Sequence, residues 1–170
     1  MADGDQKPIE QVKIGDDVVA SDPQTGVTGA KVVTAAVTTP DDEDFTDLSL
    51  QDGQASTNAG SGQDATLTTT WHHPFWSVTS GRWEEASSLQ VGERLQQPDE
   101  TAVTVNGVRN YHQQALTYNL TVADFHTYYV LAGATPVLVH NSDCGPEMTG
   151  VKTRSAPPHR SAPPEPAPPA

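Results

Sequence analysis

The sequence has little cysteine, little positive charge and no long apolar run. Its single cysteine, Cys144, excludes an internal disulfide and a zinc site built on several thiolates. Only 9 lysines and arginines stand against 22 acidic residues, so a nucleic acid is not an expected partner. The acids are scattered apart from a cluster at Asp41–Asp44, which is typical of solvated surface. No apolar run reaches the length of a membrane span and Met1–Asp5 does not resemble a signal peptide, so the sequence indicates neither membrane insertion nor a compartment.

Proline is unevenly distributed along the 170 residues. Half of the 14 prolines lie between Pro157 and Pro169, where Ser-Ala-Pro-Pro occurs twice. This composition predicts a disordered, polyproline-like tail. The remainder holds enough apolar residues for a core. We therefore expect one domain over residues 1–141, followed by a flank and a disordered tail over residues 142–170.

Short stretches rich in valine, threonine and aromatic residues alternate with turn residues along the chain. They predict strands at 18–20, 31–39, 48–50, 65–78 with a break at Pro74, 103–108, 115–122, 128–131 and 135–141. One helical turn is expected near 84–89, and a flexible loop at 53–64. Many short strands separated by Gly, Asn, Asp and Pro turns are typical of an all-β domain.

A short pattern occurs twice with an offset of 77 residues. The apolar residues and the Gly-acid pair of the segment 10–18 are matched in the segment 87–95. Two copies of a short pattern suggest two related β units in a two-lobed domain.

The segment that ends the last expected strand carries groups that could cleave the backbone. Val137–Val139 predicts a short buried strand, and His140, Asn141 and Ser142 follow it directly. The Asn141 amide nitrogen can attack its own carbonyl carbon, closing a succinimide and releasing Ser142, and the intramolecular geometry favours this step. His140 could protonate the leaving nitrogen. The ordinary interpretation of the same residues is a strand end followed by a polar turn.

Two further segments carry a hydroxyl or an imidazole near a strand end. Thr70 and His73 lie close to the break at Pro74, and His126 follows the strand at 115–122. Each also has an ordinary interpretation as a turn or packing residue. Because side chains alternate along a strand, His72 and His73 should face opposite ways, and at most one belongs to a given site.

Taken in order, four segments resemble a Hint domain, the self-processing fold of inteins, bacterial intein-like domains and hedgehog autoprocessing domains. The resemblance is strongest to the pretoxin Hint modules of bacterial polymorphic toxins. The matching segments are 1–18, 70–76, 118–130 and 137–141. The resemblance implies an all-β, intein-like two-lobed fold and protein self-processing without a cofactor. Residues 74–117 are too few for an inserted homing endonuclease, so the module is of the minimal kind.

At the upstream side, the resemblance implies that Thr70 and His73 polarise a scissile amide and that His126 assists proton transfer. The family carries a Cys or Ser nucleophile ahead of the segment that matches Met1–Gly4, and no residue of this chain matches it. We expect the first strand of the fold to be absent with that nucleophile. Its absence should leave an unpaired edge near Val18–Ala20 or at the final strand.

At the downstream side, the resemblance makes His140 the penultimate histidine, Asn141 the terminal asparagine and Ser142 the first downstream residue. A polymorphic toxin carries a toxin domain there, whereas this sequence has only its Pro-rich segment. The expected activity is therefore one cut per molecule, between Asn141 and Ser142. The expected partners are the chain's own flanks and an upstream fragment that carries the absent strand.

Two alternatives remain open from the sequence. One is a metal-binding enzyme that uses His73, His126 and His140, although no two of these have a short ligand spacing. The other is an inactive remnant that serves only as a structural or binding domain.

Overall fold

The computed structural model describes residues 1–51 and 64–141. The tail predicted over 142–170, including Ser142, lies outside the described residues, as does the loop predicted at 53–64 apart from Asp64. Strands and two short 3₁₀ turns make up the described part, which confirms the all-β prediction. The elements are η1 Ile9–Gln11, β1 Asp17–Asp22, β2 Val27–Gln51, β3 Ala65–Thr70, β4 Pro74–Ser77, β5 Arg82–Glu85, η2 Ala86–Ser88, β6 Arg94–Gln96, β7 Ala102–Val122, β8 Thr127–Ala132 and β9 Thr135–His140. The η2 turn lies where the sequence predicts one turn of helix.

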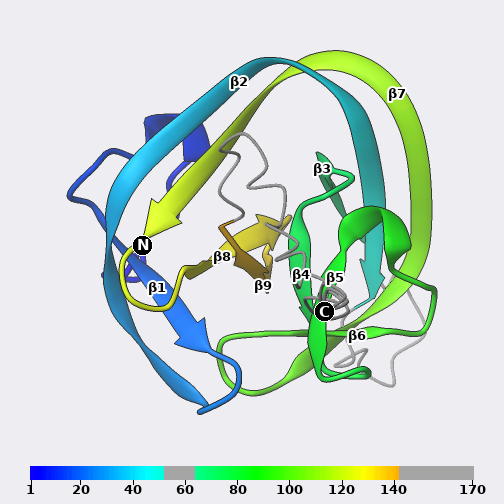
Figure 1. Cartoon of the computed structure of the whole chain (residues 1–170). Helices are drawn as coiled ribbons and strands as arrows, with labels where there is room; N and C mark the ends of the chain where they lie inside the picture. Colours follow the sequence, from blue (N-terminus) through cyan, green and yellow to red (C-terminus); the bar gives the residue numbers. More distant parts are fainter. Residues whose placement is uncertain (52–63, 142–170) are drawn as a thin grey trace, which may run out of the picture.

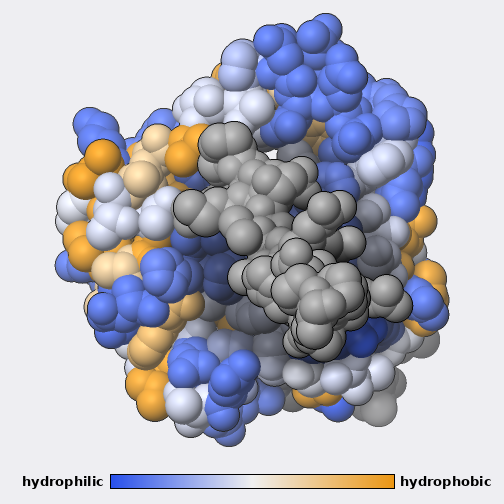
Figure 2. Space-filling view, in the orientation of Figure 1, coloured by the Kyte–Doolittle hydropathy of each residue, from blue (hydrophilic) through white to orange (hydrophobic). Residues whose placement is uncertain are grey.

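Two strands are much longer than the sequence predicts. The expected strands at 31–39 and 48–50 are parts of β2, and those at 103–108 and 115–122 are parts of β7. The polar residues between them stay in the ladder because their side chains pair across it, as in the hydrogen bond between Asp44 and His112 (2.7 Å) and that between Thr117 and Asp42. Register shifts lie on both sides of Asp42, and β2 and β7 together form the long curved arch of Figure 1. The upper part of the face shown in Figure 2, over this arch, is mainly hydrophilic, as the acidic cluster predicts.

The sheet curls until its two ends meet. The strand order is β1-β2-β7-β6-β4-β9-β8, with β3 attached to β2 and β5 to β4. At the meeting point of β1 and β8, the Ser21 N–H donates to Thr127 Oγ1 (3.2 Å), and this hydroxyl donates to the Ser21 carbonyl (2.7 Å). β1 and β8 are therefore the two ends of this strand order, and β3 and β5 each pair with one described strand as well. The prediction of an edge at Val18–Ala20 is correct, and the alternative at the final strand is wrong, because β9 lies between β4 and β8.

The repeat seen in the sequence is also a structural repeat. The Gly15 N–H donates to the Val33 carbonyl (2.9 Å), and the Gly92 N–H donates to the Val105 carbonyl (2.8 Å). Both glycines have a positive φ, 94° and 97°, which disfavours any residue with a Cβ. In each unit the turn is preceded by a 3₁₀ turn, η1 or η2. The 77-residue offset therefore relates two equivalent hairpin-like units.

Both units contribute to one apolar core. Val12 and Val18 of the first unit and their counterparts Leu89 and Leu95 are buried in the same cluster. The third matched pair, Ile14 and Val91, stands in solvent at 69% and 65% exposure. The core therefore joins the two units.

In the part of the chain that the structure describes, no helix is long and apolar enough to cross a membrane.

Candidate functional site

The end of β9 is held from both sides. Val139 is paired with Tyr128 of β8 and with Phe75 of β4, and the side chains of Val137–Val139 are fully buried. The predicted buried strand is therefore confirmed. Asn141, directly after it, is only 3% exposed. An asparagine at such a strand end has little freedom to move relative to its neighbours.

A strained turn fixes Asn141 from the other side. The Asn141 N–H donates to the carbonyl of His126 (2.8 Å) just ahead of β8. Asp124 and His126 adopt φ values of 63° and 55°, which few non-glycine residues do. The turn is closed further by the Phe125 N–H, which donates to the Ala123 carbonyl (2.8 Å). This backbone places the exposed His126 beside the end of β9.

His140 lies between two aromatic neighbours. Its ring centroid is 6.3 Å from that of His126 and 5.1 Å from that of Trp83, and the plane of the indole is inclined by 68°. Sequence reasoning missed Trp83, although the turn at Ser80-Gly81 shows that Trp76 and Trp83 face each other across a hairpin. Only the fold shows that this hairpin lies next to β9.

His73 reaches the same region from the start of β4. Its ring packs edge-on against Phe75 (5.8 Å) and Tyr128 (6.4 Å). Burial, together with the smaller effect of the positive charge of a protonated His140, lowers the pKa of His73 to about 4. His73 is therefore a neutral imidazole at neutral pH. His72 turns the other way, 74% exposed and 3.2 Å from Glu85, as the alternation rule predicts.

Thr70 belongs to the turn that carries His73. It is the last residue of β3, and its carbonyl accepts the N–H of His73 (3.2 Å). The structure thus brings His73, His126, His140 and Asn141 into one region, with Thr70 at its margin. Ser142 lies outside the described residues.

The Asn141 side chain has an unusual environment. Its Oδ1 atom is buried and has no hydrogen-bond partner among the described residues. A buried polar atom without a partner costs about 1–3 kcal/mol, so such atoms are rare and often belong to functional sites. An amide in this state is not locked by hydrogen bonds through its oxygen.

The three histidines do not form a metal site in the part of the chain that the structure describes. There, no group of three or more His, Cys, Asp and Glu side chains is arranged to hold a metal ion. The arrangement instead offers imidazoles around one asparagine, which suits proton transfer to and from an amide.

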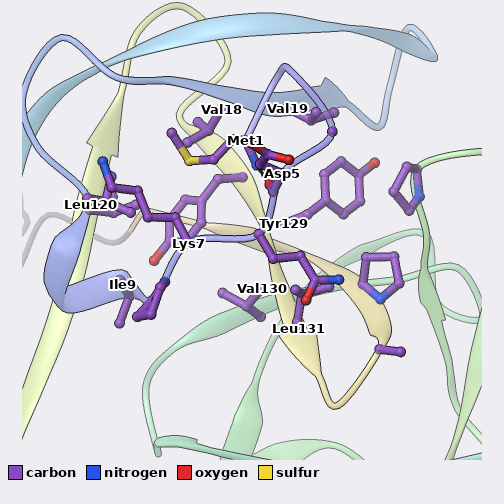
Figure 3. A pocket seen from close by; sticks show the side chains of 18 residues that line it. Met1, Asp5, Lys7, Ile9, Val18, Val19, Leu120, Tyr129, Val130 and Leu131 are labelled. Carbon is purple, nitrogen blue, oxygen red and sulfur yellow. Dashed lines mark hydrogen bonds between the residues drawn. The ribbon is translucent and has the colours of Figure 1, made fainter.

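A groove of about 790 Å³ opens where β1 and β8 diverge (Figure 3). Val18 and Val19 form one wall, Tyr129–Leu131 forms the other, and Met1 and Asp5 lie between them. Tyr128, which packs on His73, also lines this groove. The groove and the surroundings of His73 therefore share one residue, Tyr128.

Comparisons with known proteins agree with the all-β fold. The family model "Pretoxin HINT domain" matches residues 1–142. The solution structure of a bacterial intein-like domain from Clostridium thermocellum shares 31% identity, with a TM-score of 0.64 over 78% of this chain and 86% of that one. A DnaB intein from Synechocystis sp. PCC 6803 (17% identity, TM-score 0.58, 82% and 89%) and the gp41-1 intein (17%, 0.55, 79% and 87%) share the fold. A comparison with curated protein sequences finds no match.

Proposed function

The chain belongs to the pretoxin Hint domain family, an autoprocessing class of domain, and from this premise we propose that it cuts its own backbone once, between Asn141 and Ser142. The observation that carries the proposal is the position of Asn141. It is buried, held by β9 and by His126, adjacent to His140, and its Oδ1 lacks a hydrogen bond among the described residues.

The proposed reaction is asparagine cyclisation. The Asn141 side-chain nitrogen forms a bond to the Asn141 carbonyl carbon, and the bond from that carbon to the Ser142 nitrogen breaks. The attacking nitrogen gives up one proton and the leaving nitrogen gains one, so the reaction needs no net proton. The products are a chain ending in a succinimide and a fragment that begins with the free amine of Ser142.

Histidines carry the proton transfers in this scheme. His140 protonates the leaving nitrogen. The ring centroid of His126 is 6.3 Å from that of His140, and His126 returns a proton to His140 or accepts one from the attacking amide. His73 and Thr70 belong to the upstream half of the family's chemistry. For this chain the proposal concerns the downstream cut.

The groove between β1 and β8 suits an upstream partner segment. Two open sheet edges can pair with an extended peptide, and the walls formed by Val18, Val19 and Tyr129–Leu131 can bury its alternate side chains. We propose that a segment carrying the family's nucleophile binds there and ends near His73. The parent molecule in this proposal is a larger polypeptide of the polymorphic-toxin type, with the module between an upstream region and a downstream effector.

Mass spectrometry of the full-length chain tests the proposed cut. The purified chain should slowly release a fragment that begins at Ser142, and the remaining chain should end in a succinimide or its hydrolysis product. Asn141→Ala should abolish release, because no other side chain there can close the ring. The control, Asn106→Ala, removes an exposed asparagine whose side-chain amide donates to the Asp64 carboxylate, and it should keep the wild-type rate. Absence of the fragment after prolonged incubation would identify an inactive remnant instead, and equal release from Asn141→Ala would identify contaminating proteolysis.

A further inference from the structure

The ring of Trp83 packs against that of His140, and the reaction proposed above assigns Trp83 no role. It lies on β5, directly opposite Trp76, and among the described strands β5 pairs only with β4. The two indole centroids are 5.2 Å apart and nearly perpendicular, and Trp76 is buried. Trp83 is therefore held from behind by a core residue.

Its other neighbour is the imidazole of His140. The ring centroids are 5.1 Å apart at an interplanar angle of 68°, a distance and an angle within the range of favourable edge-to-face contacts. The backbones that carry the two rings are fixed relative to each other, because β4 pairs with β5 on one side and with β9 on the other. The contact thus joins two rigid elements through two side chains.

The chemistry of the cut makes the orientation of His140 important. A proton donor must point at the nitrogen of the breaking bond, and a misplacement of about 1 Å can cost on the order of 100-fold in rate. His126 also lies near His140, but it is exposed and its ring is more distant. Trp83 is the closer and better supported of these two neighbours.

We propose that Trp83 is a positioning residue for cleavage: its indole holds the His140 imidazole in the orientation that protonates the leaving nitrogen. This inference rests on the proposed cut at Asn141. It assigns a role to a residue of the β4–β5 hairpin, far in sequence from the residues that cut. Trp83 itself does not touch the reacting atoms and exchanges no proton.

The test compares fragment release from the full-length chain and two Trp83 variants. Trp83→Leu should slow release by about 10-fold to 100-fold. Trp83→Phe keeps an aromatic ring at the position and should retain at least about one third of the wild-type rate. Trp83→Leu should also move the midpoint of the pH–rate profile, because the surroundings of the His140 imidazole change. A merely structural contribution would lower stability and leave both the midpoint and the rate of the folded fraction unchanged.

Trp71→Leu is the matched control. Trp71 also packs on a histidine, His112, with the two ring centroids 4.9 Å apart. Its indole N–H donates to the Phe45 carbonyl (2.7 Å). Its loss should lower stability and leave the release rate of folded molecules within about threefold of wild type. If Trp83→Leu releases the fragment at the wild-type rate while Asn141→Ala releases none, the positioning role of Trp83 is wrong and the proposed cut still stands. A wild-type chain that releases nothing would instead overturn the cut.

A measurement on the uncut protein keeps the inference testable if Trp83→Leu does not fold. In NMR spectra of the Asn141→Ala chain, the ring proton signals of His140 are assigned by their loss in the His140→Gln variant. The ring current of Trp83 should displace the chemical shifts of these signals. Replacing Trp83 by Phe should reduce this displacement, whereas Trp71→Phe should not. His140 signals at the positions of free histidine would overturn the proposed contact.

Discussion

The backbone N–H of Asn141 donates a 2.8 Å hydrogen bond to the carbonyl oxygen of His126, which has a left-handed φ of 55°. His126 therefore has two separable contributions to the end of β9. Its carbonyl fixes the Asn141 backbone, and its imidazole lies 6.3 Å from that of His140.

Two substitutions of His126 separate these contributions. His126→Gly removes the imidazole and keeps the turn, because glycine accepts a positive φ without strain. We expect release of the Ser142 fragment to slow by about 100-fold or more, as for a lost proton-transfer group. His126→Ala should lose as much rate and about 1 kcal/mol more stability, since its Cβ strains the turn. Mass-spectrometric rates and urea unfolding measure the two effects.

The outcome of His126→Gly decides between imidazole and backbone. If the variant cleaves at the wild-type rate, only the carbonyl of residue 126 matters. His112→Gly is the control, because His112 is an exposed histidine paired with Asp44 on the arch, outside the site. It should leave the rate unchanged.

Replacing His140 should slow the cut without abolishing it. His140→Ala removes the proton donor for the leaving nitrogen, and we expect a loss of about 10²–10⁴-fold in the rate of release. Added imidazole should restore part of this rate, because the truncated side chain leaves space beside Trp83. Rates measured with and without imidazole check this. A rate for His140→Ala equal to wild type would assign the proton transfer to another group.

The sequence predicts the strands of the site better than the contacts between them. The valines of β9, the Gly15 and Gly92 turns and the opposite faces of His72 and His73 follow from local patterns, and the structure agrees with them. These features depend on residues close together in the chain. Prediction succeeds there because backbone preferences and side-chain alternation act locally.

Contacts between distant segments were the part that could not be predicted. The polar middle of β2 stays in the sheet only because β7 supplies polar partners such as Thr117 and His112. The contact of Trp83 with His140 depends on β4 lying between β5 and β9, a sheet order that no local pattern indicates. The seam at Ser21 and Thr127 likewise appears only when the sheet has curled.

That seam should make a measurable contribution to stability. Thr127→Val keeps the shape of a buried side chain but removes both hydrogen bonds to the Ser21 backbone. Leaving a buried N–H and a buried carbonyl unpaired should lower the free energy of unfolding by about 2–6 kcal/mol, at about 1–3 kcal/mol per group. Urea titration measures the change. Thr68→Val is the control, since its exposed hydroxyl bonds to Asp47 and water can replace the bond. Equal stability of both variants would show that the seam does not hold β1 to β8.

The structural repeat predicts equal sensitivity of its two glycines. A Cβ at Gly15 or Gly92 would meet no atom within 4 Å, so only the positive φ opposes an alanine there. Gly15→Ala and Gly92→Ala should each lower the free energy of unfolding by about 1–2 kcal/mol. Gly29→Ala is the control, because its surroundings are equally open and its φ lies outside the left-handed region. It should cost nothing measurable, and thermal unfolding compares the three. Strongly unequal losses at Gly15 and Gly92 would contradict the equivalence of the two units.

The lowered pKa of His73 should make the protein less stable in mild acid. Between pH 6.5 and pH 4 the unfolded chain binds a proton at His73 and the folded chain does not, so stability falls as the pH falls. From pH 7 to pH 5 the loss should be at most about 2 kcal/mol, since one pKa unit corresponds to about 1.4 kcal/mol. Carboxyl groups with lowered pKa values, such as Asp16 and Asp124, lose their contributions only below their usual range near pH 4.

Urea titrations at pH 7 and pH 5 isolate this contribution. His73→Gln cannot titrate and should lose less stability than wild type between the two pH values. His72→Gln changes the exposed neighbouring histidine and should keep the wild-type loss. A His73→Gln chain with the wild-type loss would mean that His73 is protonated as readily in the folded protein as in the unfolded chain. The neutral imidazole that packs between Phe75 and Tyr128 would then not exist at pH 5.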